Sequence, residues 1–386
     1  MNILFICKKV PYPATDGESI VIMNDLMTLK SLGHSVHIFA FNTKKHFVDT
    51  HNFSQNELWD SFQDVPIDTT LSFKQILTSL FSKFPIQIHR FYSKKAAQLL
   101  IDTIKNFNID TIIYQGLATT LYHPRLASSF KGTHIYRIHN VEHEIWENLS
   151  KNATNYFHRW TYNIIAQSLK TYESQRLSSF DRMITLSENE TLLFKNYYPL
   201  QNIRTIAISL TDDTFKNHYQ EPKEPSLLIV GSLDWKPNIE GIDWFLEHIY
   251  PQLSSIKLTI AGKGNAQHHW KKESINIVTN FEHLESLFST HSLLIIPLLS
   301  GAGIRIKVLE AMKYGIPFVA TSKAIEGIQM NTLSYLVTNQ KEEFILKIKT
   351  LLHSTELRSQ YSKKLLANYS ENYSKKSIAN EWKNVL

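Results

Sequence analysis

The chain has 386 residues, of which 43% are hydrophobic and 20% are charged, and this composition excludes a wholly disordered protein. One hydrophobic core serves at most roughly 250–300 residues, so we expect two domains. The formal net charge of +6 is too small to indicate a nucleic-acid-binding protein. The single cysteine, Cys7, excludes a disulfide framework and a zinc site built from several cysteines.

The first half of the chain alternates short apolar runs with helical patterns. We expect strands at residues 3–7, 36–41, 111–114, 135–138 and 183–186, with a helix over residues 17–32 that Gly33 ends. Apolar strands that alternate with helices are typical of a parallel, doubly wound sheet with helices on both faces.

The second half repeats this pattern after a polar interval at residues 211–225, which has two prolines and no periodicity and is typical of a linker. Further strands are expected at residues 227–230, 258–261, 275–278, 293–297, 317–321 and 335–337. The prediction is an α/β protein with two Rossmann-like domains, residues 1–210 and 226–370, which face each other across a cleft. Ligands of such sheets bind at the carboxyl ends of the strands.

No apolar run approaches the ~18 residues of a membrane-spanning helix. The start, MNILFICKK, has too short an apolar run for the core of a signal peptide. We therefore expect a cytoplasmic protein whose contact with a membrane, if it has one, is peripheral and on the inner face.

The most informative stretch is residues 298–321, LLSGAGIRIKVLEAMKYGIPFVAT. A loop of small residues enters a helix here, and its backbone N–H groups suit a phosphate or sugar hydroxyls. This loop consists of Gly301, Ala302, Gly303 and Ile304.

Three charged residues follow this loop. Arg305 and Lys307 fall in the first turn of the expected helix, where cations are unfavourable, so their presence suggests an anionic ligand, although ordinary solvated charges are the alternative. Glu310 lies within an apolar run, where a carboxylate is costly unless it is paired or bound to a ligand.

The string GAGIRIKVLEAMKYGIPFVAT resembles the donor-binding signature of glycosyltransferase family 4, in the branch with a Gly-x-Gly-x-Arg-x-Lys-x-x-Glu run. Other segments resemble parts of the same family in the same order: PYPATDG (11–17), RIHNVE (137–142), DRMITLS (181–187), IVGSLDWKPN (229–238) and AGKG (261–264). The resemblance covers nearly the whole chain and implies the two-domain GT-B fold. It also implies that the last helix, within residues 371–386, crosses back to the N-terminal domain.

The resemblance implies an enzyme that moves a sugar from a nucleotide-diphosphate-sugar donor to an acceptor hydroxyl, with retention and without a cofactor or metal. The sequence agrees in having no Asp-x-Asp motif, so cations must stabilise the leaving diphosphate. Arg305 and Lys307 would do this, Glu310 would bind the donor ribose, and His139 would contact the transferred sugar or orient the acceptor. A strand-end histidine taken alone is more often structural.

The remaining site residues are also implied by the resemblance. The donor would be bound by the loop before Arg305 and by Gly231, Ser232, Lys236, Gly262, Asn280 and Phe281. Gly17, Glu18 and Asn140 would line a phosphate or acceptor loop, although Gly17 also fits an ordinary helix start.

Two positions depart from the family's pattern. Ala302 stands where many members have a glutamate, which leaves the identity of the sugar open. Ser232 stands where many have an arginine, and Lys236 only approximately matches their lysine, so Arg305 and Lys307 would carry more of the contact with phosphate.

The expected partners are a nucleotide sugar and a glycan or lipid-linked acceptor of envelope polysaccharide or glycolipid synthesis, and no nucleic acid. Residues 71–95 combine an apolar face with lysines and an arginine, so they could lie on an anionic membrane, or pack as a helix on the N-terminal sheet. Two other functions stay open: an inactive GT-B scaffold at a membrane surface, and a sugar-nucleotide epimerase, which would need more acidic residues in the cleft.

Overall fold

The computed structural model describes residues 1–14, 16–53, 57–70, 84–199, 202–210, 219–265, 268–279, 281, 284–301 and 305–386. The chain forms two compact units. The first comprises Met1–Ile208 together with Ile378–Leu386, and the second comprises Ser209–Ser377.

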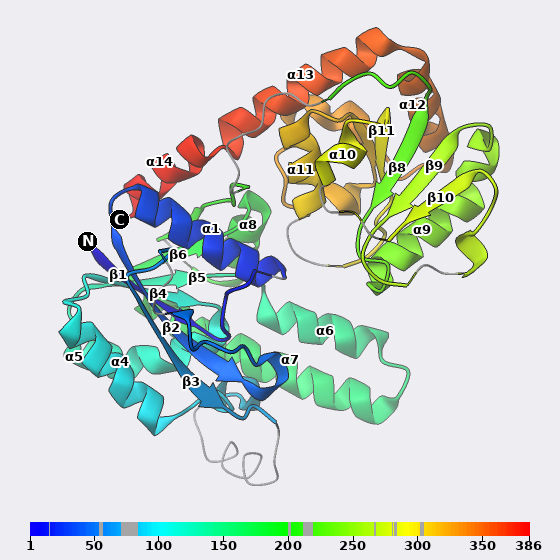
Figure 1. Cartoon of the computed structure of the whole chain (residues 1–386). Coiled ribbons are helices and arrows are strands. Elements are labelled where there is room, and N and C mark those ends of the chain that lie inside the picture. The colour runs from blue at the N-terminus through cyan, green and yellow to red at the C-terminus, as the bar shows by residue number, and fades with distance from the viewer. Residues whose placement is uncertain are drawn as a thin grey trace. The chain divides into compact units, whose positions relative to one another are not determined.

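The first unit is built on a parallel sheet of seven strands in the order β3-β2-β1-β4-β5-β6-β7 (Figure 1). Its strands are β1 (Asn2–Cys7), β2 (Ser35–Thr43), β3 (Ser61–Ile67), β4 (Thr111–Gln115), β5 (Thr133–Arg137), β6 (Arg182–Thr185) and β7 (Ile203–Thr205). The order reverses between β1 and β4, and this reversal creates the switch point at which doubly wound sheets bind ligands.

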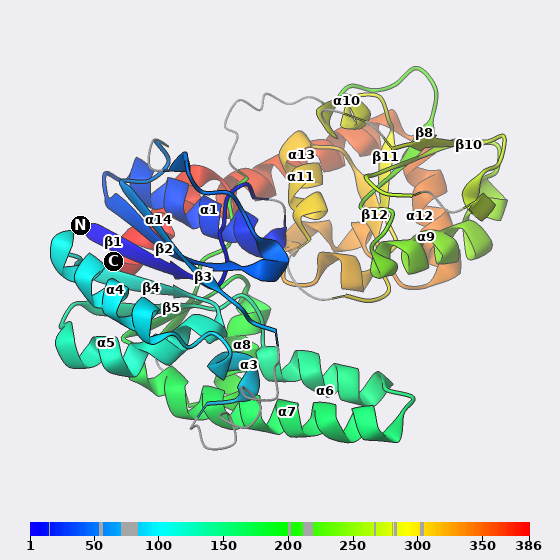
Figure 2. The same cartoon turned by 60° about the horizontal axis from the view of Figure 1, so that its bottom comes forward.

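Helices cover both faces of this sheet (Figure 2). The α-helices of this unit are α1 (Gly17–Ser31), α3 (Ile86–His89), α4 (Lys94–Asn106), α5 (His123–Ser129), α6 (Glu142–Asn152), α7 (Tyr156–Arg176), α8 (Glu188–Tyr197) and α14 (Lys375–Val385). Short 3-10 helices are η1 (Lys44–His46), η3 (Leu117–Tyr122) and η4 (Leu177–Ser179).

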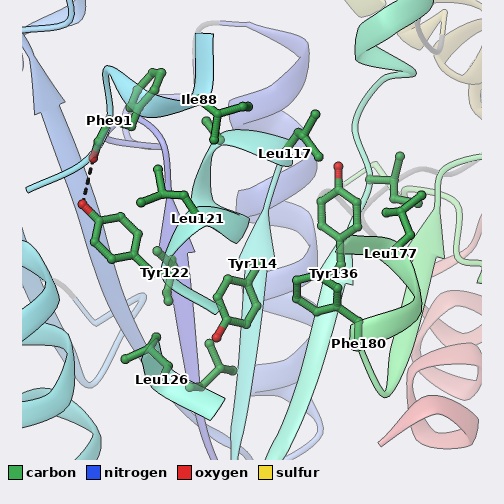
Figure 3. Packing of buried hydrophobic residues seen from close by; sticks show 14 of the residues in the cluster. Ile88, Phe91, Tyr114, Leu117, Leu121, Tyr122, Leu126, Tyr136, Leu177 and Phe180 are labelled. Carbon is green, nitrogen blue, oxygen red and sulfur yellow. Dashed lines mark hydrogen bonds between the residues drawn. The ribbon is translucent and has the colours of Figure 1, made fainter. Parts of the chain in front are cut away.

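The two faces of the sheet carry separate cores because successive strand residues point to opposite sides. In β1, Ile3 and Phe5 enter the core under α1 and α14, whereas Leu4 and Ile6 enter the core under α4, α5 and α7. The second of these cores is rich in tyrosine (Figure 3), and the hydroxyl of Tyr122 donates to the backbone carbonyl of Phe91 at 2.7 Å.

A fully buried ion pair joins α1 to β5 in the first unit. Arg137 Nε lies 2.8 Å from Asp25 Oδ2, and Arg137 Nη1 donates to the carbonyls of Thr185 and Ile206. Arg137 also lies 6.0 Å from the ring of Trp382 in α14. The pair therefore holds α1, three strand ends and the last helix in one arrangement.

The second unit contains a parallel sheet of five strands in the order β10-β9-β8-β11-β12 (Figure 1). They are β8 (Ser226–Val230), β9 (Lys257–Ala261), β10 (Ile275–Val278), β11 (Leu293–Ile296) and β12 (Phe318–Ala320). Its α-helices are α9 (Lys236–His248), α10 (Leu284–Phe288), α11 (Ile306–Tyr314), α12 (Lys341–His353) and α13 (Thr355–Asn372). Its 3-10 helices are η5 (Tyr250–Leu253), η6 (His268–Trp270), η7 (Ser322–Ile325) and η8 (Asn331–Leu336).

The predicted strands match those of the structure within one or two residues at each end, with one exception. Residues 335–337 were predicted as a strand, but they fall at the end of η8, and only Val337 forms an isolated bridge, to Ala320. The turn of η8 satisfies the backbone locally, so the apolar run does not extend the sheet. Sequence analysis did not predict β3 or β7.

The proposed membrane segment at residues 71–95 lies largely outside the described residues, because 71–83 are not described. Its described part is not one continuous helix, since α3 and α4 are separate and Ser93 caps α4. Phe84 packs against the core and lies 5.8 Å from the ring of Tyr172. Within the described chain, no helix combines the length and hydropathy needed to cross a membrane.

Candidate functional site

In the second unit, the loops after β8, β9 and β11 gather at the carboxyl edge of the sheet, around the switch point between β8 and β11. Two glycines allow the first two loops to approach. A Cβ on Gly262 would lie 1.8 Å from the carbonyl oxygen of Gly231, and a Cβ on Gly231 would lie 2.5 Å from Asn238 Nδ2. Gly262 therefore requires glycine because of a close backbone approach, whereas a side chain at Gly231 would displace Asn238.

Lys307, in the first turn of α11, reaches across this edge to β8. Its ammonium donates to the carbonyl of Val230 at 3.1 Å and to Asn238 Oδ1 at 2.8 Å. Asn238 Nδ2 in turn donates to the carbonyl of Ser232 at 2.9 Å. Burial, and then the charge of Arg305, lower the pKa of Lys307 to about 8, while Glu310 acts in the opposite direction.

Arg305 immediately precedes α11 and is only 4% exposed. Its guanidinium lies 5.7 Å from the ring of Trp235, and Gly301, at φ +99°, approaches both side chains closely. Burial lowers the pKa of Arg305, although a guanidinium stays charged at all physiological pH values. A second cation is therefore held next to Lys307 at the start of the helix.

Glu310 lies one turn further along α11. Burial raises the pKa of its carboxyl group to about 7, against the opposing effects of Lys307 and Lys313. Burial thus disfavours the charged form of both Lys307 and Glu310, so a ligand that pairs with either group would stabilise its charge.

The predicted donor-site residues differ in how the structure places them. Gly231, Ser232, Gly262, Gly301, Arg305 and Lys307 meet at the edge described above. Lys236 does not join them, because its side chain is 86% exposed and faces Glu240 at 3.8 Å. Phe281 is half-buried and lies in the chain segment that connects β10 to α10. Ala302, Gly303, Ile304 and Asn280 lie outside the described residues.

Sequence analysis assigned no role to Asn238 or Trp235, which contact Lys307 and Arg305. Both lie inside the quoted string IVGSLDWKPN, so their neighbourhood was visible. Their contacts were not visible, because the starts of α9 and α11 are far apart in sequence and meet only where β8 and β11 pair side by side.

In the first unit, a second group of predicted residues lies at the carboxyl edge of the sheet. A Cβ on Gly116, after β4, would lie 3.7 Å from both Glu18 Oε1 and His139 Cδ2, and 3.8 Å from Lys8 Cδ. Glu18 also pairs with Lys8 at 3.1 Å. Gly17 is the first residue of α1, after its N-cap Asp16, and Asn140 follows His139 in the loop to α6.

The hydrogen bonding of His139 defines which ring nitrogen can accept. Nε2 lies 2.7 Å from Gln115 Oε1, and since a carbonyl oxygen only accepts, Nε2 carries the proton. Burial, and then Arg137, Lys8 and Lys9, hold the pKa of His139 well below its usual range, so the ring is neutral. Nδ1 is a buried acceptor that has no partner among the described residues.

A pocket of about 460 Å³ lies at the same edge of the first sheet. Its cations, Lys8, Lys9, Lys45 and Arg90, come from the ends of β1 and β2 and from the turn after α3. Its carboxylates are Glu18 and Glu142, and its apolar wall includes Phe91, Trp146 and Leu149. The described lining thus has four cations against two carboxylates and one hydrophobic side.

Comparison with known proteins gives a consistent result. The sequence model of the family described as glycosyl transferases group 1 matches residues 224–354. The chain is 25% identical over 364 residues to an uncharacterized 44.6 kDa protein in the cps region of Klebsiella pneumoniae, covering 90% of this chain and 89% of that protein. It is 24% identical over 325 residues to an uncharacterized glycosyltransferase of Haemophilus influenzae, covering 79% and 84%.

Among solved structures, HepE of Anabaena in complex with UDP matches with a TM-score of 0.65 at 13% identity, covering 100% of this chain and 99% of that one. The two doubly wound parallel sheets and this likeness define the GT-B fold, which confirms the fold predicted from sequence. The chain is a glycosyltransferase, and its second unit carries the match to the family of glycosyl transferases group 1.

Proposed function

We propose that the second unit binds a nucleotide-diphosphate sugar and that the enzyme transfers the sugar, with retention and without a metal, to an acceptor hydroxyl. The observation that carries this proposal is the group formed by Arg305, Lys307 and Glu310 at the carboxyl edge of the second sheet. Burial disfavours the charge on all three residues, so each is poised to gain stability from a ligand.

In this mechanism, negative charge develops on the diphosphate as its bond to the sugar breaks. Lys307 and Arg305 stabilise that charge, and charge-assisted contacts of this kind are stronger in a partly buried site than in water. Glu310 accepts hydrogen bonds from the ribose hydroxyls. In the first unit, His139 Nδ1 accepts a hydrogen bond from a hydroxyl of the transferred sugar or of the acceptor.

The lining of the pocket in the first unit supports a proposal for the class of acceptor. Its cations favour an anionic group, and its wall of Phe91, Trp146 and Leu149 favours a hydrocarbon chain or another apolar body. We propose a lipid-linked phosphate as the acceptor, which places the reaction in glycolipid or envelope polysaccharide synthesis at the inner face of the cell membrane. The relative in the Klebsiella cps region supports this assignment.

The test is the release of nucleoside diphosphate from a panel of nucleotide sugars, with and without a lipid-linked phosphate acceptor, in the presence of a chelator. We expect one donor to be turned over and the acceptor to accelerate release. Binding of a donor without turnover under any condition would instead indicate a non-catalytic protein.

A second experiment addresses the acceptor pocket. Arg90→Ala should raise KM for the phosphorylated acceptor roughly tenfold or more, because a charge-assisted contact is worth about 1.5–3 kcal/mol. It should have little effect with an uncharged acceptor. Arg125→Ala, at an exposed position of α5, is the matched control and should leave both values unchanged.

A further inference from the structure

The helices α6 and α7 form an antiparallel hairpin that extends from the first sheet, as Figures 1 and 2 show. Its base is fixed by His143 and Glu173, which are buried and lie 2.5 Å apart. Further along, the ring of Trp146 lies 5.6 Å from that of Tyr162, and Ser150 Oγ donates to the carbonyl of Arg159. The hairpin is therefore a packed element whose outer surface has a defined shape.

That outer surface is unusually apolar near the tip. The exposed fractions are 45% for Leu149, 82% for Tyr156, 65% for Phe157, 54% for Trp160 and 48% for Ile164. Tyr156, Trp160 and Ile164 are spaced by four residues, so they share one face of α7. The rings of Phe157 and Trp160 lie 6.3 Å apart, and five large apolar side chains exposed within 16 residues of the chain are of the kind that marks an interaction surface.

The chain that carries this patch has charges of one sign beyond Glu147. No aspartate or glutamate occurs from residue 148 to residue 172, whereas Lys151, Arg159 and Lys170 fall within that interval. Lys151 and Arg159 lie close to the turn between α6 and α7, which is the tip of the hairpin. Lys170 lies further along α7, 5.0 Å from the ring of Tyr197 in α8. Exposed tryptophan and tyrosine beside lysine and arginine suit the interface of an anionic bilayer, where aromatic rings lie at the level of the headgroups.

We propose that the tip of the α6–α7 hairpin is the surface by which this protein docks on an anionic membrane. The hairpin also carries part of the apolar wall of the pocket in the first unit, because Trp146 and Leu149 of α6 line that pocket. Docking there would bring the pocket next to the lipid surface. The inference does not depend on catalytic activity, and it assigns membrane contact to residues outside the segment 71–95.

Co-sedimentation with vesicles tests the inference. The full chain should sediment with vesicles that contain phosphatidylglycerol, should not sediment with phosphatidylcholine alone, and should be released by salt. The triple substitution Tyr156→Ser, Phe157→Ser and Trp160→Ser should abolish sedimentation without lowering Tm, because all three side chains are more than half exposed. The matched control, Phe47→Ser with Leu192→Ser and Leu346→Ser, removes three equally exposed apolar residues elsewhere and should sediment like the parent.

The charge contribution has its own test. Lys151→Glu with Arg159→Glu should weaken binding to the anionic vesicles at least about 30-fold, which corresponds to about 1 kcal/mol per cation at 1.4 kcal/mol per decade. Quenching by brominated lipid should be weaker for Trp160→Phe than for the parent, because Trp160 would no longer report from the headgroup region.

Two results would overturn the proposal. One is a parent chain that never sediments with anionic vesicles. The other is a parent that elutes as a dimer and becomes monomeric on the triple substitution, without lipid binding, which would make the patch an interface between two copies of the chain. Neither result bears on sugar transfer to a soluble acceptor, so a failure here is distinct from a failure of the proposed function.

Discussion

Glu310→Gln should stabilise the second unit while it weakens binding of the nucleotide. Burial raises the pKa of this carboxyl from an ordinary 4.5 to about 7, so the folded chain retains a proton that the unfolded chain has lost between these two values. The contribution of Glu310 to the free energy of unfolding therefore falls as the pH rises from 4.5 to 7, and above pH 7 this contribution is constant. At 1.36 kcal/mol per pH unit, the charged carboxylate costs about 3 kcal/mol at pH 8.

The glutamine variant should regain part of this amount, because the neutral amide carries no charge to bury. The gain is smaller than the full figure, since Glu310 also favours the charged form of Lys307. A carboxylate accepts hydrogen bonds from ribose hydroxyls more strongly than an amide does, so the affinity for the nucleotide sugar should fall roughly tenfold.

Urea unfolding at pH 8 and pH 5 measures the first effect, and calorimetric titration with the donor sugar measures the second. The stability difference between variant and parent should be large at pH 8 and shrink at pH 5. Glu247→Gln, at a position with a 74% exposed side chain, should change neither quantity. A glutamine variant that is less stable than the parent at pH 8, or that binds the donor equally well, would refute the role assigned to Glu310.

Three further substitutions test other contacts of the two units. Arg305→Ala should lower turnover roughly 30- to 150-fold without changing the fold, because it removes about 2–3 kcal/mol of charge stabilisation in the transition state. Near-parental rates for both this variant and Lys307→Met would disprove the assignment of these two residues to the phosphates. Asp25→Ala should destabilise the first unit by about 3–5 kcal/mol, since it leaves the buried Arg137 without its carboxylate partner. An unchanged denaturant midpoint of unfolding would contradict this role of the ion pair. Gly262→Ala should prevent normal folding of the second unit, because the added Cβ would lie 1.8 Å from the carbonyl oxygen of Gly231. A melting curve like that of the parent would be inconsistent with the close packing of these loops.

The strands were predictable where they are buried on both faces, because such strands are continuous apolar runs. Strand β3 was missed because its sequence, SFQDVPI, lies at the edge of the sheet and keeps several half-exposed polar residues. Strand β7 has only three residues, which is too short for a periodic signal. Its place in the sheet depends on pairing with β6.

The site was predictable in part for a similar reason. Arg305, Lys307 and Glu310 lie within six residues at the start of α11, so their pattern is local. The pairing of Lys307 with Asn238 spans 69 residues, and the contact of His139 with Gln115 joins two neighbouring strands, so neither could be predicted from local spacing. The hairpin patch was missed because periodicity alone does not tell whether an apolar face is buried or exposed.

The most direct test of the account is the release of nucleoside diphosphate by the intact chain, measured with a chelator present across a panel of nucleotide sugars and with a lipid-linked phosphate as the acceptor. The account predicts that one donor is turned over, that the acceptor accelerates release, and that Arg305→Ala combined with Lys307→Met removes the activity while the melting curve persists. Release that is unchanged in the double variant, or the absence of both binding and turnover for every donor in the panel, would contradict it.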